Sequence, residues 1–533
     1  MSRFYKVFCC LLLLAITLGL APVELRADDT QTSSLVIHVL ADGTGDYRTL
    51  ADAIAAATAG AIIIIGEGTF THSESLSIRV PMQLVGAGPD LTEIVSDASE
   101  CTVSVMTDGR FSAQGIAFRH KGDAVGDAVV VDAGEAYISA CLFTGAVQSY
   151  SQGYARPAAG LRIVGHTTGV VSNCTMTANT GEGIRLEGTS EMLVEDSTCA
   201  KNLAGIGMFF SGAASGVAQR NACVDNEQAG IGIEDEATPT IASNVCQGNT
   251  GSGIGYRGTA SGIAKGNQCL ANGMNGIYVG EQAAPTLDSN TCRENKMPGI
   301  AYVGAASGNA KGNQCLRNEG QGIMVAEQAA PTLDGNTCRG NAWGGITYRG
   351  STSGIAKGNQ CLTNEQHGIY VAEQAHPTLD SNTCQGNKWT GIAYFETASG
   401  TAKANQCLTN EQYGIYVAEQ AHPTLDSNTC QGNKWSGIGY AGTASGIAKA
   451  NQCLQNEQSG IIVAEQAHPT LGSNTCQGNK QAGIAFLAGG RGTASLNTCY
   501  GNQFGIYVAQ TAGPRLVGNS CYNNTVADVR DLR

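Results

Sequence analysis

A cysteine recurs every 23 residues through more than half of this 533-residue chain. The spacing holds from Cys223 to Cys499, and Cys521 follows after 22 residues. The text between the cysteines repeats as well, because the segment 357–394 returns almost unchanged from Lys403 onward. Self-similarity at a fixed period of about 20–50 residues indicates a solenoid, in which each coil stacks on the one before it.

The apolar positions within a coil favour short strands over helices. Isoleucine stands eight residues after each cysteine, as at Ile369, and valine or tyrosine stands two residues further on, as at Val371. This period of two is that of a strand, whereas a leucine-rich repeat would need several leucines per coil. We therefore predict an all-β chain with three short strands per coil, wound into a single right-handed parallel β-helix.

Stacking turns each repeated position into a column, with neighbours about 4.8 Å apart. Asparagine stands two residues before and three residues after most cysteines, as at Asn382 and Asn387, which predicts two ladders of stacked amides. Lysine alternates with an acidic residue at two further positions, which fixes the register of the stack. Parallel Cβ vectors at this spacing fit a disulfide poorly, so we expect a buried column of free thiols. No paired Cys or His has metal-ligand spacing, so no metal site is expected.

The N-terminus and the charge limit where this chain acts and what it binds. Arg3 and Lys6 precede the apolar run 7–21, which indicates a cleavable signal peptide ending after Ala27. The expected location is therefore secreted, periplasmic or on the cell surface, with no membrane span after the signal is removed. The formal net charge of −13 without a basic run argues against nucleic acid as a partner.

The chain before the regular repeats differs in composition. Thr49 is a suitable N-cap for a short helix in which Leu50, Ala53, Ile54 and Ala57 share one face, and this helix would cap the first coil. The predicted organisation is a signal peptide (1–27), a leader with the cap helix (28–60), irregular coils (61–220), regular coils (221–525) and a polar tail (526–533).

Two stretches carry a family resemblance. Residues 42–47 (Asp-Gly-Thr-Gly-Asp-Tyr), with 53–57 and 68–70, resemble the opening of pectin methylesterases in the pectin-lyase-like superfamily. From Gly160 onward, pairs such as Gly183-Ile184 resemble the β-helix repeats of carbohydrate-binding and sugar-hydrolysing proteins. The resemblance implies the β-helix fold. The esterase segments that carry the aspartates and the arginine (Gln-Asp-Thr-Leu, Asp-Phe-Ile-Phe-Gly and Gly-Arg-Pro-Trp) do not occur here.

A catalytic site would have to lie where the repeats are imperfect. The candidates are four carboxylates close together in the sequence: Asp123, Asp127, Asp132 and Glu135. We prefer to interpret this cluster as a polar loop between coils. A cofactor is not expected, and calcium would enter only if the chain were a polysaccharide lyase.

Aromatic residues supply the candidate binding site. Trp343, Trp389 and Trp435 occupy one position, five residues after the cysteine in alternate coils, while Tyr278, Tyr370 and Tyr416 occupy the ninth position in the other coils. The ninth position should face outward and the tenth, with its own tyrosines, inward. A glycine column, including Gly345 and Gly391, would form the floor of a trough between the aromatic rows.

We therefore expect an exported protein that binds polysaccharide or a cell-surface glycan, or serves as a surface scaffold, without a catalytic site of its own. Two alternatives stay open. One is a polysaccharide-active enzyme (a lyase, an epimerase or a pectinesterase-like carbohydrate esterase) with its site in the irregular N-terminal coils. The other is a purely structural spacer.

Overall fold

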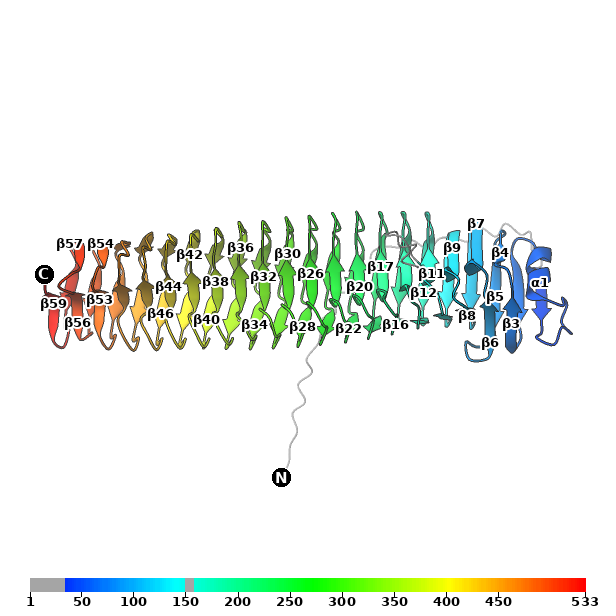
Figure 1. Cartoon of the computed structure of the whole chain (residues 1–533), viewed down its shortest axis with the longest axis horizontal. Helices are drawn as coiled ribbons and strands as arrows, with labels where there is room; N and C mark the ends of the chain where they lie inside the picture. Colours follow the sequence, from blue (N-terminus) through cyan, green and yellow to red (C-terminus); the bar gives the residue numbers. More distant parts are fainter. Residues whose placement is uncertain (1–33, 149–157) are drawn as a thin grey trace, which may run out of the picture. The chain divides into compact units, whose positions relative to one another are not determined.

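The chain from Leu35 onward is a right-handed parallel β-solenoid of about 21 turns in the computed structural model, as the sequence predicts. The structure describes residues 34–148 and 158–533. Successive coils stack along one axis from α1 (Leu50–Ala56) to β59 (Ala527–Asp531) (Figure 1). The predicted signal peptide lies outside the described residues.

Each regular coil contributes one strand to each of three parallel sheets. In a representative coil the strands are β38 (Ile369–Val371), β39 (Thr378–Asp380) and β40 (Thr383–Gln385). The chain turns between them at residues in the left-handed region, namely Glu373 (φ 60°) and Ser381 (φ 56°). The next coil repeats the arrangement, with Ile369 paired to Ile392 and Cys384 paired to Cys407.

We call the three sheets the isoleucine, threonine and cysteine sheets after these strands. Strands of the cysteine sheet are centred on each cysteine, from β19 (Ala222–Val224) to β55 (Thr498–Tyr500). Strands of the threonine sheet include β21 (Thr240–Ala242), β39 and β51 (Thr470–Gly472). The regular strands of the isoleucine sheet are β20 (Ile231–Ile233), β23 (Ile254–Tyr256), β26 (Ile277–Val279), β29 (Ile300–Tyr302), β32 (Ile323–Val325), β35 (Ile346–Tyr348), β38, β41 (Ile392–Tyr394), β44 (Ile415–Val417), β47 (Ile438–Tyr440) and β50 (Ile461–Val463).

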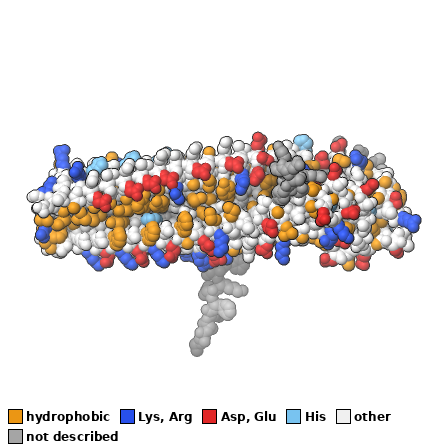
Figure 2. All heavy atoms as spheres, viewed as in Figure 1, with side chains coloured by type: hydrophobic (Ala, Val, Ile, Leu, Met, Phe, Trp, Pro, Cys, Tyr) orange, Lys and Arg blue, Asp and Glu red, His pale blue; other side chains and the backbone are white. Residues whose placement is uncertain are grey.

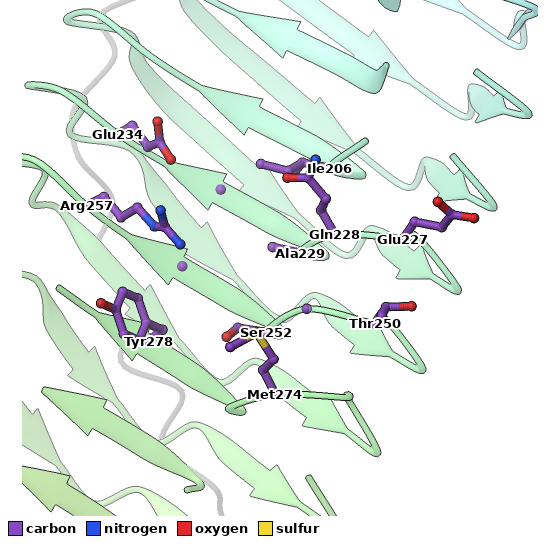
Figure 3. Close-up of a pocket in the computed structure, with 13 residues that line it drawn as sticks. Ile206, Glu227, Gln228, Ala229, Glu234, Thr250, Ser252, Arg257, Met274 and Tyr278 are labelled. Atoms are coloured by element: carbon purple, nitrogen blue, oxygen red, sulfur yellow. The ribbon is translucent and has the colours of Figure 1, made fainter. Parts of the chain in front are cut away.

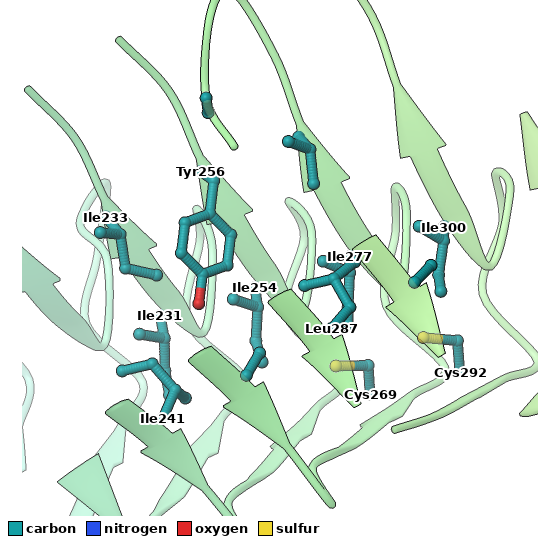
Figure 4. Close-up of a cluster of buried hydrophobic side chains, with 14 of the residues drawn as sticks. Ile231, Ile233, Ile241, Ile254, Tyr256, Cys269, Ile277, Leu287, Cys292 and Ile300 are labelled. Atoms are coloured by element: carbon teal, nitrogen blue, oxygen red, sulfur yellow. The ribbon is translucent and has the colours of Figure 1, made fainter. Parts of the chain in front are cut away.

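The interior of the solenoid consists of the columns that the repeats predict. Cysteine, isoleucine and leucine side chains point inward together (Figure 4). Tenth-position tyrosines, such as Tyr302 and Tyr394, are fully buried. Both asparagine ladders are present: the amide of Asn387 donates to Asn410 Oδ1 (2.9 Å) and to the Cys361 carbonyl (3.0 Å). The core is therefore set by the stacking of identical positions.

The cysteines from Cys101 to Cys521 are free thiols in the structure, and the first 17 of them are buried. Burial raises the pKa of the Cys384 thiol well above its ordinary value, and the neighbouring thiols of Cys361 and Cys407 raise it further. Reagents in solution do not reach thiols buried in the column, and buried structural cysteines are inert.

We therefore expect the folded protein, without reductant, to resist thiol-alkylating reagents. The chain has 20 cysteines, and Cys9 and Cys10 lie in the predicted signal peptide. After denaturation, nearly all of the other cysteines should react. A thiol count near zero in the denatured protein would instead show disulfides and contradict the free column.

The first coils use longer strands and a helix. Helix α1 begins after the N-cap Thr49, whose side chain accepts from the Asp52 N–H, and buries Leu50, Ala53 and Ile54, which confirms the predicted cap helix. β7 (Glu100–Gln114) and β9 (Gly126–Ser139) each continue through a corner from the isoleucine sheet into the threonine sheet.

At the other end, the residues expected to form a polar tail include β59, which pairs with β56 (Phe504–Val508) as the last strand of the isoleucine sheet. Within residues 34–148 and 158–533, no helix is long and apolar enough to cross a membrane.

Candidate functional site

The middle residue of each isoleucine strand faces outward, as the alternation predicts. Tyr278, Tyr370 and Tyr416 hold this position and are half-buried, while their neighbours on either side in the strand are fully buried. Pairing places Thr347, Tyr370, Ala393 and Tyr416 in one column on successive coils. Large and small side chains therefore alternate along this face.

The three tryptophans of the chain lie beside this column, just before the isoleucine strands begin. Their exposed fractions are 53% for Trp343, 42% for Trp389 and 40% for Trp435. Exposure of this extent is unusual for indoles, which normally bury most of their surface. The tryptophans thus expose part of each indole to solvent at intervals of two coils, about 9.6 Å.

The structure joins both predicted aromatic rows into one cluster through residues that the sequence analysis did not select. The Tyr413 ring stacks on Tyr416 at 4.6 Å and makes a T-shaped contact with Trp435 at 5.1 Å. The His367 ring stacks on Tyr370 at 5.3 Å and meets Trp389 at 5.1 Å. Phe395 links the two halves, with centroid distances of 5.6 Å to Tyr370 and 5.7 Å to Tyr416.

This cluster surrounds two adjoining hollows of about 280 and 270 Å³, which share His367 and Trp389. We call the cluster and its hollows the aromatic trough. Its aromatic and histidine residues are Trp343, His367, Tyr370, Trp389, Phe395, Tyr413, Tyr416 and Trp435.

His367, Phe395 and Tyr413, which the sequence analysis did not select, could have been found as departures from the repeat. At the position of His367 and Tyr413, six after the cysteine, other cassettes have Asn275, Gln321 and Ser459. Where Phe395 and Glu396 stand, the equivalent coils read Arg-Gly, Val-Gly, Arg-Gly and Ala-Gly. All three aromatic or histidine substitutions fall on neighbouring coils, so the trough is a local addition to an otherwise uniform solenoid.

The His367 and Tyr413 side chains inside the trough are uncharged near neutral pH, and acidic residues follow one border of the trough (Figure 2). Burial lowers the pKa of His367 to about 4, so its imidazole is uncharged near neutral pH, and burial followed by the neighbouring Tyr416 raises the pKa of Tyr413 to about 12. Figure 2 shows a band of hydrophobic side chains along the solenoid with acidic side chains following one edge. Burial, followed by the charges of Glu465 and Glu419, raises the pKa of Tyr416.

The glycine column does not form the floor of the trough, and that expectation is wrong. A Cβ on Gly345 would lie 2.7 Å from Cys361 Cβ, so the missing side chain faces the buried cysteine column. Gly345 precedes the strand at a corner of the coil, where strict strand alternation does not apply. The small outward residues of the trough are instead Thr347, which is 4% exposed, and Ala393.

A second hollow of about 430 Å³ lies on the same sheet, nearer the N-terminus. Its floor is opened by two outward glycines, Gly232 and Gly255, and a Cβ on Gly255 would meet nothing within 4 Å. Glu234, Arg257 and Tyr278 line one side on successive coils (Figure 3). Burial raises the pKa of Glu234, and the Arg257 charge opposes the shift. Tyr278 therefore belongs to this hollow and not to the aromatic trough.

The four N-terminal carboxylates do not gather. Asp123 is exposed in the loop before β9, Asp132 is exposed at the corner of β9, and Glu135 is exposed in the half of β9 that joins the threonine sheet. Asp127 is 1% exposed in the other half, where Oδ1 accepts from the Ala159 N–H at 2.6 Å. Asp127 thus tethers the backbone of the next coil. Across the described residues, no three His, Cys, Asp or Glu side chains are placed to hold a metal ion.

Comparisons with known proteins agree with this architecture. A family model described as a right-handed β-helix region matches residues 127–279, 258–361, 321–465 and 443–530. A search of curated protein sequences finds no match.

Solved structures with a similar fold include the Dettilon tailspike protein, the mannuronan C-5 epimerase AlgE4 A-module of Azotobacter vinelandii and pectin methylesterase from carrot. Their sequence identities are 19%, 15% and 14%, and the TM-scores are 0.43, 0.35 and 0.29. The matches cover 61%, 61% and 48% of this chain and 65%, 86% and 82% of those chains, so the chain spans less than two thirds of the tailspike. At these identities the likeness concerns the fold alone.

Proposed function

This chain belongs to the right-handed β-helix family, and from that premise we propose that it is an exported protein that binds a polysaccharide along the aromatic trough. The observation that carries the proposal is the local concentration of substitutions. His367, Phe395 and Tyr413 depart from the repeat on neighbouring coils and join Trp389 and Trp435 into one exposed aromatic surface. A spacer would need the repeat alone.

The chemistry of the trough suits sugar rings. Pyranose rings present apolar C–H faces that pack on exposed indole and phenol rings. The side chains stand on a stacked sheet and contact one another, so little conformational entropy remains to be lost on binding. Because aromatic platforms recur along the axis, a polymer can engage several weak subsites together.

A binding role also fits the placement of the carboxylates better than the enzymatic alternative does. Glycoside hydrolysis and β-elimination each need acid and base groups converging on one bond. Asp127 is committed to a backbone hydrogen bond, and Glu135 lies on a different sheet. The spacer alternative leaves the aromatic substitutions without a role.

The test is a binding measurement with Trp389→Ala. Trp389 borders both hollows of the trough, so its loss should weaken polysaccharide binding about tenfold or more, which corresponds to roughly 1.4 kcal/mol. Affinity electrophoresis and tryptophan fluorescence against a panel of neutral, acidic and amino-sugar polysaccharides provide the measurement.

Tyr522→Ala is the matched control, because Tyr522 is also an exposed aromatic (43%) but lies on the cysteine sheet. Its binding should equal that of the parent protein. If no polysaccharide in the panel binds, the proposal fails.

A further inference from the structure

The border of the aromatic trough carries an unusual series of carboxylates. Twelve residues after the cysteine, the repeat alternates glutamate with glycine, as in Glu327, Gly350 and Glu373. Glu396 replaces the expected glycine, so Glu373, Glu396 and Glu419 follow one another on three successive coils. This break falls beside Phe395, at the centre of the trough.

The carboxylates are close enough to act on the trough electrostatically. Burial raises the pKa of Tyr370, the negative charge of Glu396 adds to the shift, the Arg349 charge opposes it, and Glu419 and Glu373 add to it further. Glu419 Oε2 accepts the backbone N–H of Glu396 at 2.9 Å, which holds this carboxylate in place along the border.

The lysine and arginine side chains near the trough do not neutralise the negative charge of Glu396 and Glu419. Arg349 lines the first hollow, but it bonds to Glu373 at 3.0 Å and is therefore already paired. On the opposite border, Lys388 pairs with Glu365, and Lys434 pairs with Glu411 at 3.3 Å. Among the described residues, Glu396 has no ion-pair partner, and no lysine or arginine lines the trough's hollow of about 270 Å³ between Trp389 and Trp435.

This arrangement favours a cation over an anion. Aromatic faces attract ammonium groups through their quadrupole, and nearby carboxylates add to the attraction. A uronate polymer would bring carboxylates next to Glu396 and Glu419 without a free cation to receive them. A neutral sugar would use the rings but gain nothing from the charges.

We infer that the polysaccharide bound in the aromatic trough is a polymer of amino sugars with free ammonium groups, held by the aromatic rings and by Glu396 and Glu419. The inference rests on the proposed function, because it specifies the ligand class of the same site. It also gives Glu396 a role that the repeat does not require.

Three oligosaccharides of equal length test the inference at about pH 5.5, above the ordinary pKa of a glutamic acid in a model peptide: a fully deacetylated glucosamine oligomer, its N-acetylated form and a uronic acid oligomer. Titration calorimetry with the full chain should show the deacetylated oligomer binding at least tenfold tighter than the acetylated one. The advantage should shrink at high salt, because the charges are partly exposed.

Glu396→Gln should reduce the affinity for the deacetylated oligomer severalfold and leave the acetylated oligomer unaffected. Asp334→Asn is the matched control, since Asp334 is an exposed carboxylate on the threonine sheet, and it should change neither affinity. Trp389→Ala should weaken both.

The outcomes separate the two proposals. Equal binding of the acetylated oligomer, or tighter binding of the uronate, overturns the charge inference and leaves polysaccharide binding intact. Oligolysine binding as tightly as the deacetylated oligomer also overturns it, because charge alone would then suffice. If none of the oligosaccharides binds, the proposed function itself is wrong.

Discussion

Asn387→Leu should destabilise the solenoid by about 3–5 kcal/mol, although leucine is apolar and branches at the same side-chain carbon. The Asn387 side chain joins three coils. Its Oδ1 accepts both the backbone N–H and the Nδ2 of Asn364, each at 3.0 Å, and its Nδ2 donates to Asn410 Oδ1 and to the Cys361 carbonyl. Leucine removes all four interactions, and the buried Asn364 N–H loses its acceptor.

A buried polar group without a partner costs about 1–3 kcal/mol, so the loss exceeds the gain from the added apolar surface. Each coil contacts only its neighbours, so the damage should be local. Hydrogen exchange should show lost protection at the backbone amide of Asn364 before the distant coils are affected.

Gln385→Leu provides the control from the same coil, because Gln385 is exposed. Its unfolding free energy should stay within about 0.5 kcal/mol of the parent protein. If Asn387→Leu were equally mild in urea denaturation, the ladder would not be a main source of stability.

The orientation of the repeated positions could be predicted because stacking places the same position on many coils, and each coil gives separate information on whether that side chain points inward or outward. Cys384, Asn387 and Tyr394 each belong to a column in which the same residue type returns at a fixed interval, and all three are buried. The cap helix was predictable for a different reason: Thr49 and the apolar face of residues 50–57 carry local signals that need no tertiary context.

The trough was only half predictable, because its contacts run diagonally between columns. Trp389 and Tyr370 stand out in the sequence as repeated aromatics. Phe395 occurs only once at its position, and its contact with Tyr370 on the neighbouring coil becomes visible only in the stacked structure. The long strands β7 and β9 were likewise hidden, since the first coils lack the glycine and cysteine marks that divide later coils into three strands.

The misplaced glycine column leads to the second large effect. Gly391→Ala should cost about 3 kcal/mol, the upper range for forcing an extra group into a packed interior. An added Cβ would lie 2.6 Å from the Gly414 carbonyl oxygen and 2.9 Å from both Cys407 Cβ and Asn410 Nδ2. The first contact is with backbone and the third with the ladder, so neither partner can move without separating two coils.

Because Gly391 follows Trp389 by two residues, such a separation would also distort the aromatic trough. The matched control is Gly255→Ala, where the new methyl group enters open space and the unfolding free energy should change by less than about 0.5 kcal/mol. Urea denaturation of both variants measures the difference directly. Equal stabilities would mean that coils can spread to admit a methyl group, and the glycine before each isoleucine strand would then need another explanation than contact with the buried cysteines.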